Sequence, residues 1–348
     1  MRIKGNISFI LIVILLMSVF VAGCSGKDAP NDNAANNDGE ETKVLKLANY
    51  FGEDHPVNVA LREKFVPMVE EQSNGTLKVE IYPNSQLGDE KAIYDGVRSG
   101  SIEMAVGGSH IASDIKKMEV PEWPYLFQSF AQAKKVLNGP IGDELTSEIE
   151  SSYNIIPLSW GTNGFRAFSS NRPLKSMADF KGLRMRMPNI PHFMEVGEAM
   201  GMNVNPVPIS EVFTALEQNV VDGQDNPIAL LRSNGWYEVQ SDVLESRHMF
   251  AYNLMIINKD VWESLSKNLQ QVIRTAAVAY ADSEWELMEN SELTDKKFLE
   301  ENGSAFITPD EKFLADMQQA TEPLYEKHFA DYPWAEELVN KIREETKK

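Results

Sequence analysis

Two arginines stand out because they lie within apolar, strand-like runs of the sequence. Arg166 follows Trp-Gly-Thr-Asn-Gly-Phe at 160–165, and Arg186 lies between Met185 and Met187. An arginine in such a run projects to one face of a strand and needs a partner there. Its planar guanidinium fits a carboxylate through two parallel hydrogen bonds. These residues indicate an anion site, although pairing with the chain's own acidic side chains or exposure to solvent would also explain them.

Motifs for catalysis and for nucleotide binding are missing. The sequence contains no GxGxxG, no GxxxxGK[ST] and no GxSxG, and its five histidines show no pair at metal-ligand spacing. Residues 113–116 match the SxxK motif of penicillin-recognising enzymes, but residues 264–267 match equally well and the companion motifs SDN and KTG are absent. The sequence therefore predicts no enzyme, no metal and no cofactor.

Composition narrows the possible partners. The 348 residues include 33 Lys and Arg against 52 Asp and Glu, a formal charge of −19. A nucleic-acid-binding protein must neutralise phosphates with Lys and Arg, so nucleic acid is not expected as a partner. A few cations placed in a cleft could still bind a small anion. The single cysteine excludes intrachain disulfides.

The N-terminal segment has the features of a lipoprotein signal. Arg2 and Lys4 precede an apolar stretch, residues 9–22, which is too short to span a bilayer comfortably. It ends in Val-Ala-Gly-Cys, which resembles a bacterial lipobox, so residues 1–23 are predicted to be a signal peptide and Cys24 to be lipidated. The polar stretch that follows, up to residue 42, is predicted to be a flexible tether spanning about 20–25 Å. The protein is thus expected outside the cytoplasm, anchored to the membrane by lipid.

The remaining chain alternates predicted strands and helices. A βαβαβ order at its start predicts parallel strands joined by helical crossovers, hence an α/β fold. Pro67 should kink or break the first of these helices. The predicted helices there cover 57–72 and 88–99, and the predicted strands of the chain are 44–49, 77–82, 102–106, 155–160, 165–169, 183–187, 204–207 and 220–223.

A long helix is predicted towards the C-terminus. Residues 261–302 contain neither proline nor glycine, and apolar residues recur at helical spacing. A helix of about 36 residues would be roughly 54 Å long, more than the width of one small domain. It should either break near Asp282 or run along two domains.

The segment from 180 to 227 resembles a known family. Phe-Lys-Gly-Leu-Arg-Met-Arg-Met-Pro at 180–188 and Asp-Gly-Gln-Asp-Asn-Pro at 222–227 are similar to the DctP-type substrate-binding proteins of tripartite ATP-independent periplasmic (TRAP) transporters. The resemblance covers essentially all of residues 43–330. It implies a two-domain periplasmic-binding-protein-like fold with a long C-terminal helix across both domains. Domain I would comprise 43–163 plus 251–291, and domain II 164–250 plus 292–348, including the C-terminal helices.

The resemblance also implies how a carboxylate would be held. Arg186 resembles the family's arginine that forms a salt bridge with the ligand carboxylate. Arg166 resembles the second cation near that group, and Asn226 resembles the asparagine that hydrogen-bonds to it.

Further polar contacts to the ligand are implied for Asn49, Glu90 and His248, while adjacency in the sequence places Asn163 and Trp160 beside the cleft. Each has an ordinary alternative. Asn49 and Glu90 lie at helix-entry positions, where capping is the usual role. His248 could be a buried structural histidine, and Trp160 could belong to the core.

One departure from the family limits the choice of ligand. Sialate-binding members carry an acidic residue where this chain has Val-Gly-Gly-Ser at 106–109, so the glycines should leave space but no carboxylate for a glycerol tail. Sialate is therefore disfavoured. A C4-dicarboxylate and a sugar acid such as a uronate both remain open.

The leading hypothesis is a binding protein that captures an organic acid and delivers it to a TRAP permease in the membrane. An extracytoplasmic enzyme acting on a carboxylated substrate is the second hypothesis, and a ligand-binding partner of a membrane sensor is the third. The missing nucleophile–base pair and metal set favour the binding protein.

Replacing Cys24 tests the predicted lipid anchor. A Cys24→Ala variant should be released from the membrane or left with its signal peptide, because the lipid is attached to this sulfur. Fractionation of cells and the mass of the mature chain report the outcome. Unchanged membrane retention with an unchanged mature mass would rule out lipidation at Cys24.

Overall fold

A computed structural model describes residues 42–347, so the predicted signal peptide and Cys24 lie outside the described residues. In this part of the chain, ten strands form one sheet in the order β2-β1-β3-β9-β4-β7-β5-β6, with β8 pairing with β4 and β10. The strands are β1 (Lys43–Ala48), β2 (Leu77–Tyr82), β3 (Met104–Gly107), β4 (Ile155–Ser170), β5 (Arg184–Met187), β6 (Asn203–Pro206), β7 (Gly223–Pro227), β8 (Asp242–Leu244), β9 (Phe250–Asn258) and β10 (Ala305–Ile307).

Helices connect these strands and confirm the α/β fold predicted from the sequence. The α-helices are α1 (Pro56–Ala60), α2 (Val66–Gln72), α3 (Glu90–Ser99), α4 (Phe130–Leu137), α5 (Pro140–Ser152), α6 (Met177–Phe180), α7 (Pro191–Ala199), α8 (Val212–Glu217), α9 (Ile228–Ser233), α10 (Lys259–Glu263), α11 (Lys267–Glu301), α12 (Glu311–Asp331) and α13 (Ala335–Lys347). The shorter turns are η1 (Leu61–Phe65), η2 (Ser109–Ser113), η3 (Lys116–Glu122), η4 (Ile209–Glu211) and η5 (Trp236–Glu238).

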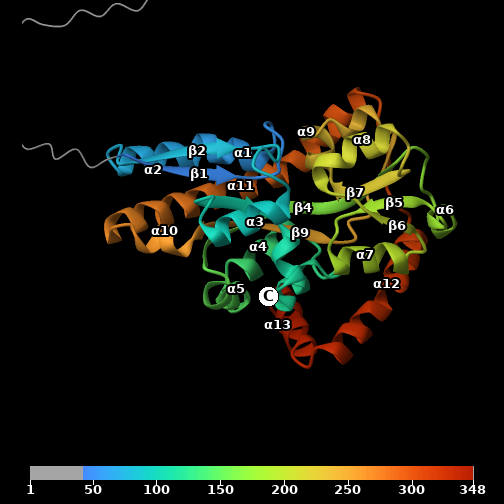
Figure 1. The fold of residues 1–348 in the computed structure, drawn as a ribbon. Coiled ribbons are helices and arrows are strands. Elements are labelled where there is room, and N and C mark those ends of the chain that lie inside the picture. Colours follow the sequence, from blue (N-terminus) through green and yellow to red (C-terminus); the bar gives the residue numbers. More distant parts are fainter. Residues whose placement is uncertain (1–41, 348) are drawn as a thin grey trace, which may run out of the picture. The chain divides into compact units, whose positions relative to one another are not determined.

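The sheet supports two lobes. In the first lobe, which holds β1–β3 and α1–α5, β1 pairs in parallel with β2 and β3. In the second lobe, which holds β5–β8 and α6–α9, β5 pairs in parallel with β6 and β7. β4 and β9 are antiparallel to each other and pass from one group of elements to the other (Figure 1). The two lobes are therefore joined through these two strands.

β4 is longer than the sequence indicates. The predicted strands 155–160 and 165–169 form one continuous strand of 16 residues. The register with β9 shifts between Thr162 and Gly164, and Gly164 takes a positive φ of 92°. This bulge accommodates the small and polar residues that looked like a loop in the sequence. The strand predicted at 220–223 begins later in the sequence than predicted and occupies Gly223–Pro227.

Pro67 affects the helix that precedes it. The predicted helix over 57–72 is present, but its middle turn, η1, is a π-turn in which the Val66 N–H donates to Leu61 O. A proline has no N–H and its ring crowds the carbonyl four residues earlier. The wider π-turn makes room for the ring, so the helix is adjusted rather than ended.

α11 runs unbroken for 35 residues across both lobes. It packs against α1, η1 and α2 of the first lobe and against α9 of the second. The expected break near Asp282 does not occur, and its side chain pairs with Lys134 Nζ at 3.0 Å. The alternative prediction, a helix lying along two domains, is confirmed (Figure 1).

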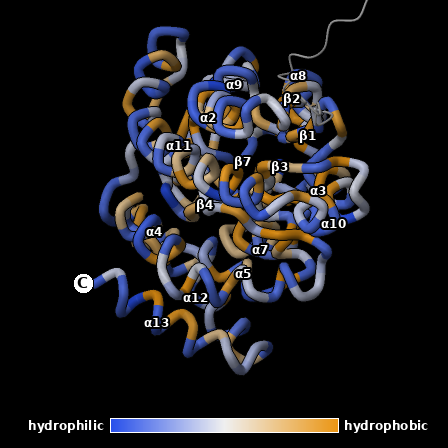
Figure 2. The backbone as a smooth tube through the Cα atoms, turned by 90° about the vertical axis from the view of Figure 1, so that its left-hand side faces the viewer, coloured by the Kyte–Doolittle hydropathy of each residue, from blue (hydrophilic) through white to orange (hydrophobic). Residues whose placement is uncertain are grey.

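Two hydrophobic clusters form the core. The larger runs through the first lobe, β9 and α11 and extends to α8 and α9 of the second lobe, while the smaller lies around Phe168, Phe180 and Phe193 of the second lobe and includes Phe313 of α12. Figure 2 shows hydrophobic positions gathered on the central strands, whereas α13 alternates between hydrophobic and hydrophilic residues. No helix within residues 42–347 combines the length and hydrophobicity needed to cross a membrane.

The last two helices contact the lobes differently. α12 contacts α6 and α7 of the second lobe, and its Tyr325, His328 and Phe329 pack on Trp123 of the first. α13 contacts α4 and η3 of the first lobe. The predicted division had placed all of residues 292–348 with domain II. The apolar stripe of α13 includes Leu338, Val339 and Ile342. An amphipathic helix packs against the surface that buries such a stripe, and the order of the sequence does not determine which lobe offers that surface.

A buried carboxylate on α11 holds the bulge of β4. Glu284 is fully buried and accepts hydrogen bonds from the Thr162 N–H at 3.0 Å and from Asn253 Nδ2 at 3.1 Å. Burial raises the pKa of Glu284 to about 8. The long helix is thus tied to both β4 and β9 at the place where they pass between the lobes.

Replacing Glu284 tests this connection. Glu284→Ala removes the acceptor of two buried donors, so the free energy of unfolding should fall by about 1–3 kcal/mol. Urea denaturation measures the change. Glu286→Ala, at an exposed position of the same helix, serves as control and should change stability by no more than about 0.5 kcal/mol. Equal effects of the two substitutions would show that the Glu284 carboxylate does not hold the bulge.

Candidate functional site

A cavity lies between the two lobes, where strands end. Tyr50 follows β1, Ser109 follows β3, and residues 188–190 follow β5. Ligands of open α/β sheets bind at the carboxyl ends of parallel strands, so this is the expected place for a site. The lining residues are Tyr50, Asp89, Glu90, Lys91, Ser109, His110, Asn163, Arg166, Arg186, Pro188, Asn189, Ile190, Phe193, Pro208, Ile209 and Asn226.

Five of the eight predicted ligand-binding residues line this cavity, and three do not. Those that line it are Arg186, Arg166, Asn226, Asn163 and Glu90. Those that do not are Asn49, His248 and Trp160.

Arg186 is a buried cation with spare hydrogen-bonding capacity. Only 3% of the residue is exposed, and its Nε donates to Val207 O at 2.8 Å. Its Nη1 is buried and has no hydrogen-bond partner among the described residues. Burial lowers the pKa of Arg186 to about 9, and the positive charge of Arg166 lowers it further. An anion in the cavity would satisfy the nitrogen and offset the desolvated charge.

Arg166, in contrast, already has a carboxylate partner. Its Nε lies 2.9 Å from Asp225 Oδ1, and its Nη2 donates to the Asp225 carbonyl. The guanidinium also lies over the Phe193 ring, with Cζ 4.4 Å from the ring centroid. Arg166 therefore contributes to the shape and polarity of the cavity while its charge is compensated within the protein.

His248 supports Asp225 instead of reaching the cavity. Its Nε2 lies 3.3 Å from Asp225 Oδ1, its Nδ1 lies 2.7 Å from Ser246 Oγ, and its ring stacks on Phe168. Burial alone would raise the pKa of Asp225, but Arg166 and His248 outweigh it and hold this pKa below its usual value. The direct ligand contact predicted for His248 is therefore corrected to an indirect role.

Two asparagines border the arginines. Asn226 donates from Nδ2 to Gln224 Oε1 at 2.7 Å, and its Oδ1 lies 3.3 Å from Arg166 Nη2. Asn163 has a buried Oδ1 without a hydrogen-bond partner in the described part of the chain. The Asn163 side chain lies close to His55 and lines the cavity, whereas Asn226 is oriented by its neighbours.

Glu90 forms the acidic side of the cavity in the first lobe. It is the first residue of α3, follows the capping residue Asp89, and accepts a hydrogen bond from the His110 N–H at 2.8 Å. Burial raises the pKa of Glu90 to about 7, although this hydrogen bond opposes the rise. The carboxyl lines the cavity and can accept hydrogen bonds from hydroxyl groups.

Asn49 is a structural residue, but it is not the helix cap that its alternative suggested, because His55 caps α1. It is fully buried, its Nδ2 donates to Asn58 Oδ1 at 2.8 Å, and its Oδ1 accepts from the Phe51 N–H at 3.0 Å. The cavity is lined instead by the next residue, Tyr50. Neighbouring side chains alternate between the two faces at the end of a strand, which explains the displacement by one residue.

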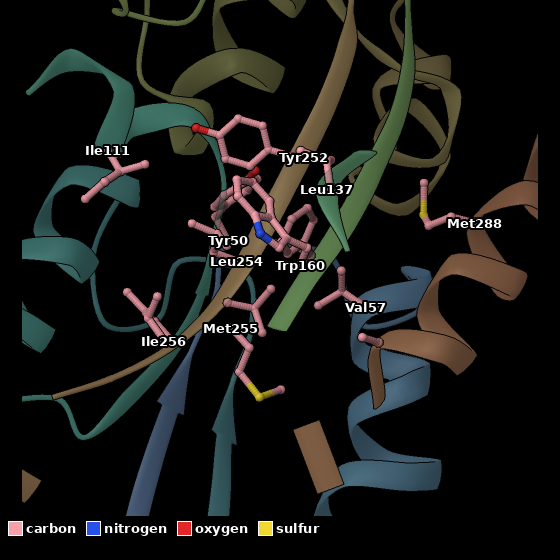
Figure 3. Packing of buried hydrophobic residues seen from close by; sticks show 14 of the residues in the cluster. Tyr50, Val57, Ile111, Leu137, Trp160, Tyr252, Leu254, Met255, Ile256 and Met288 are labelled. Atoms are coloured by element: carbon pink, nitrogen blue, oxygen red, sulfur yellow. The ribbon is translucent and has the colours of Figure 1, made fainter. Parts of the chain in front are cut away.

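Trp160 belongs to the core. Its ring packs edge-on against Tyr252 at 5.1 Å between centroids, and its carbonyl accepts a hydrogen bond from Trp285 Nε1 (Figure 3). The ligand contact expected from its position beside Asn163 is therefore corrected. An aromatic residue inside a buried strand finds more apolar contact in the core than at a polar cavity.

The two glycines at the end of β3 allow two tyrosines to approach. A Cβ on Gly108 would lie 2.6 Å from the Tyr50 hydroxyl oxygen, and one on Gly107 would lie 2.7 Å from the Tyr94 ring. The space expected beside these glycines is thus filled by aromatic rings. Tyr50, Ser109 and Phe193 were not predicted as lining residues. Tyr50 directly follows a predicted strand and Ser109 lies three residues after one, so both could have been found from these positions.

Comparison with known proteins identifies the family. The model of the bacterial extracellular solute-binding protein family 7, DctP, matches residues 47–331. The chain belongs to this family of TRAP solute-binding proteins. Within the part of this DctP protein that the structure describes, no group of three or more His, Cys, Asp or Glu side chains is arranged to hold a metal ion.

Several relatives of this DctP protein have known ligands. A TRAP periplasmic solute-binding protein from Haemophilus influenzae with bound L-gulonate is 40% identical with a TM-score of 0.84, over 87% of this chain and 99% of that one. One from Roseobacter denitrificans with bound L-galactonate is 30% identical with a TM-score of 0.79, over 86% and 99%. The 2,3-diketo-L-gulonate-binding periplasmic protein of Escherichia coli is 32% identical, over 73% of this chain and 78% of its own.

The buried Arg166–Asp225 pair of this DctP protein should be essential for stability. Asp225→Asn leaves Arg166 buried without its charged partner, so the free energy of unfolding should fall by about 3–5 kcal/mol in urea denaturation. Asp222→Asn is a matched control, because Asp222 pairs with Arg184 while both side chains are partly exposed. The control should cost at most about 1 kcal/mol. A comparable loss in both variants would contradict the assignment of a special role to the buried pair.

Proposed function

We propose that this TRAP solute-binding protein is an extracytoplasmic lipoprotein that captures a sugar acid in the interlobe cavity and delivers it to a TRAP permease. The observation that carries this proposal is that Arg186 lines the cavity and that its buried Nη1 has no hydrogen-bond partner among the described residues. A ligand carboxylate would bind there, with Asn226 beside it. Anchoring through Cys24 rests on the lipobox.

A sugar acid fits the charges of the cavity better than a C4-dicarboxylate. A second carboxylate needs a second free cation, but Arg166 is paired with Asp225, and Lys91 is paired with Asp95 at 2.6 Å. Glu90 contributes an acidic group that would repel a carboxylate and accept hydrogen bonds from hydroxyls. The L-gulonate and L-galactonate bound by two relatives have one carboxylate and several hydroxyls, which supports the same choice.

Capture should involve closure of the lobes around the ligand. We propose rigid bodies close to the predicted domains, 43–163 plus 251–291 and 164–250 plus 292–348, with α13 packed on the first. The hinge would lie near 163–164 and 250–251, where the register between β4 and β9 shifts. Neither lobe alone encloses the cavity, and hinge closure is the usual response of such proteins to a ligand.

Binding is proposed to leave the ligand chemically unchanged. An enzyme for carboxylated substrates and a sensor partner are the alternatives, and the family supports transport instead. A thermal-shift screen with L-gulonate, L-galactonate, galacturonate and succinate tests the function. A sugar acid at 100 times its dissociation constant should add about 2.7 kcal/mol to stability. Stabilisation by succinate alone would favour a dicarboxylate carrier, and a converted product found by mass spectrometry would favour an enzyme.

Arg186 should dominate the affinity for the sugar acid. Arg186→Ala removes one partner of a desolvated charge pair, which typically costs about 2–5 kcal/mol, or roughly 30- to several-thousand-fold in affinity. Isothermal titration calorimetry measures the loss. Arg184→Ala, two residues earlier on the same strand and outside the cavity lining, should bind within a few-fold of the wild type. If Arg186→Ala also bound within a few-fold, the carboxylate would have to be held elsewhere.

A further inference from the structure

Two buried ionisable side chains face each other beside the cavity without lining it. Glu122, the last residue of η3, is fully buried, and His192, the second residue of α7, is 3% exposed. Glu122 Oε2 lies 2.9 Å from His192 Nε2. The capture of a carboxylate by Arg186 does not use either group.

Both side chains are held by further contacts. The other oxygen of Glu122 accepts a hydrogen bond from the Ser109 hydroxyl. His192 Nδ1 lies 3.8 Å from Glu119 Oε1 and has no hydrogen-bond partner among residues 42–347. Glu119 itself pairs with Lys116 at 2.6 Å. The imidazole is therefore fixed mainly through its contact with Glu122.

The pair connects the two lobes next to the cavity. Glu122 and Ser109 belong to the first lobe, and Ser109 lines the cavity. His192 belongs to the second lobe, and its ring lies 4.4 Å from that of Phe193, which packs under the guanidinium of Arg166. A change in the angle between the lobes would change the distance between Glu122 and His192.

We propose that Glu122 and His192 form an interlobe hydrogen bond that is completed when the lobes close, and that closure takes up a proton at this pair. The proposal rests on the proposed function in one respect, because it takes ligand binding to be what closes the cavity. Glu122 acts as a positioning residue through Ser109 and His192, without touching the ligand.

In the proposed closed form, which has the Glu122–His192 contact described above, burial changes both protonation equilibria. It raises the pKa of Glu122 to about 8 and lowers the pKa of His192 to about 4. In the protonation state that burial favours, the protonated carboxyl of Glu122 donates a hydrogen bond from Oε2 to His192 Nε2. The hydrogen of the neutral imidazole is then on Nδ1 and points towards Glu119. Opening would expose both groups and return them towards their ordinary values, about 4.3 for Glu and 6.5 for His.

Other charges near the pair modify these values. Arg166 lowers the pKa of Glu122, whereas Asp225 raises it, and Tyr50, Glu90, Tyr94 and Tyr252 are further titratable groups that interact with it. Glu119 and Glu195 raise the pKa of His192, whereas Lys116 and Arg166 lower it, and the charge of His192 lowers the pKa of His328. Desolvation is the largest cause for both Glu122 and His192.

The sign of the pH dependence follows from these directions. At pH 7.5 an open form has an ionised Glu122 and a neutral His192, so closure takes up about 0.7 proton. At pH 5.5 His192 is protonated in the open form and passes its proton to Glu122, so the net uptake is about zero. Affinity should therefore fall as the pH rises above about 6.5, since the closed form holds the proton more tightly.

Calorimetry with L-gulonate tests the proposal. Titrations at pH 7.5 in phosphate and in Tris, which differ in ionisation enthalpy, give the number of protons taken up. Glu122→Gln keeps the hydrogen bonds but cannot ionise, so it should bind L-gulonate and take up about 0.7 proton fewer than the wild type. Glu119→Gln, an equally buried neighbour, should leave the count unchanged. Equal proton uptake by the wild type and Glu122→Gln would overturn the proposal.

Failure of L-gulonate to bind would count against the proposed ligand. Small-angle scattering of the ligand-free protein then tests the Glu122–His192 pair independently. The radius of gyration of the wild type should increase between pH 6 and pH 9, because loss of the proton favours the open form. Glu122→Gln should not show this increase. Identical pH curves for the two proteins would overturn the interlobe pair whatever the ligand is.

Discussion

The buried ion pair between Arg166 and Asp225 determines what the cavity can bind. Two arginines lie side by side in the second lobe, and two uncompensated buried guanidinium groups would repel each other strongly. Asp225 neutralises one of them, and His248 and Ser246 orient Asp225 in turn. Of these two arginines in the described part of the chain, Arg186 is the one left to receive an anion. The preference for a single carboxylate that we propose would thus be set by a carboxylate that belongs to the protein.

Much of the site could be predicted from the sequence because the motifs at 160–166, 184–188 and 222–227 lie where strands approach one edge of the sheet. Arg186, Asn226 and Glu90 line the cavity as expected. The position predicted for Asn49 is taken by the next residue. The face to which a side chain points at the end of a strand depends on where the pleated backbone ends. His248 and Trp160 were misassigned for another reason, since only tertiary packing brings Asp225 to the histidine and Tyr252 to the tryptophan.

The long helix illustrates a second limit. Its existence follows from 42 residues without proline or glycine, but its continuity through Asp282 depends on contacts with both lobes. Glu284 looks like an ordinary surface residue in the sequence. In the fold its carboxyl accepts a hydrogen bond from the Thr162 N–H, next to the register shift of β4. A buried carboxyl group of this kind cannot be recognised until the bulge is known.

The unpaired nitrogen of Arg186 has a consequence for transport fidelity. Closing the lobes without an anion buries a cation that lacks a hydrogen-bond partner, which is energetically costly. Under the proposed function, an empty carrier therefore closes less readily than a loaded one, and the two differ in shape. A permease that recognises only the closed shape would then be occupied by empty carriers less often than their number alone would give. The chemistry of one side chain would in this way act as a proofreading step for delivery.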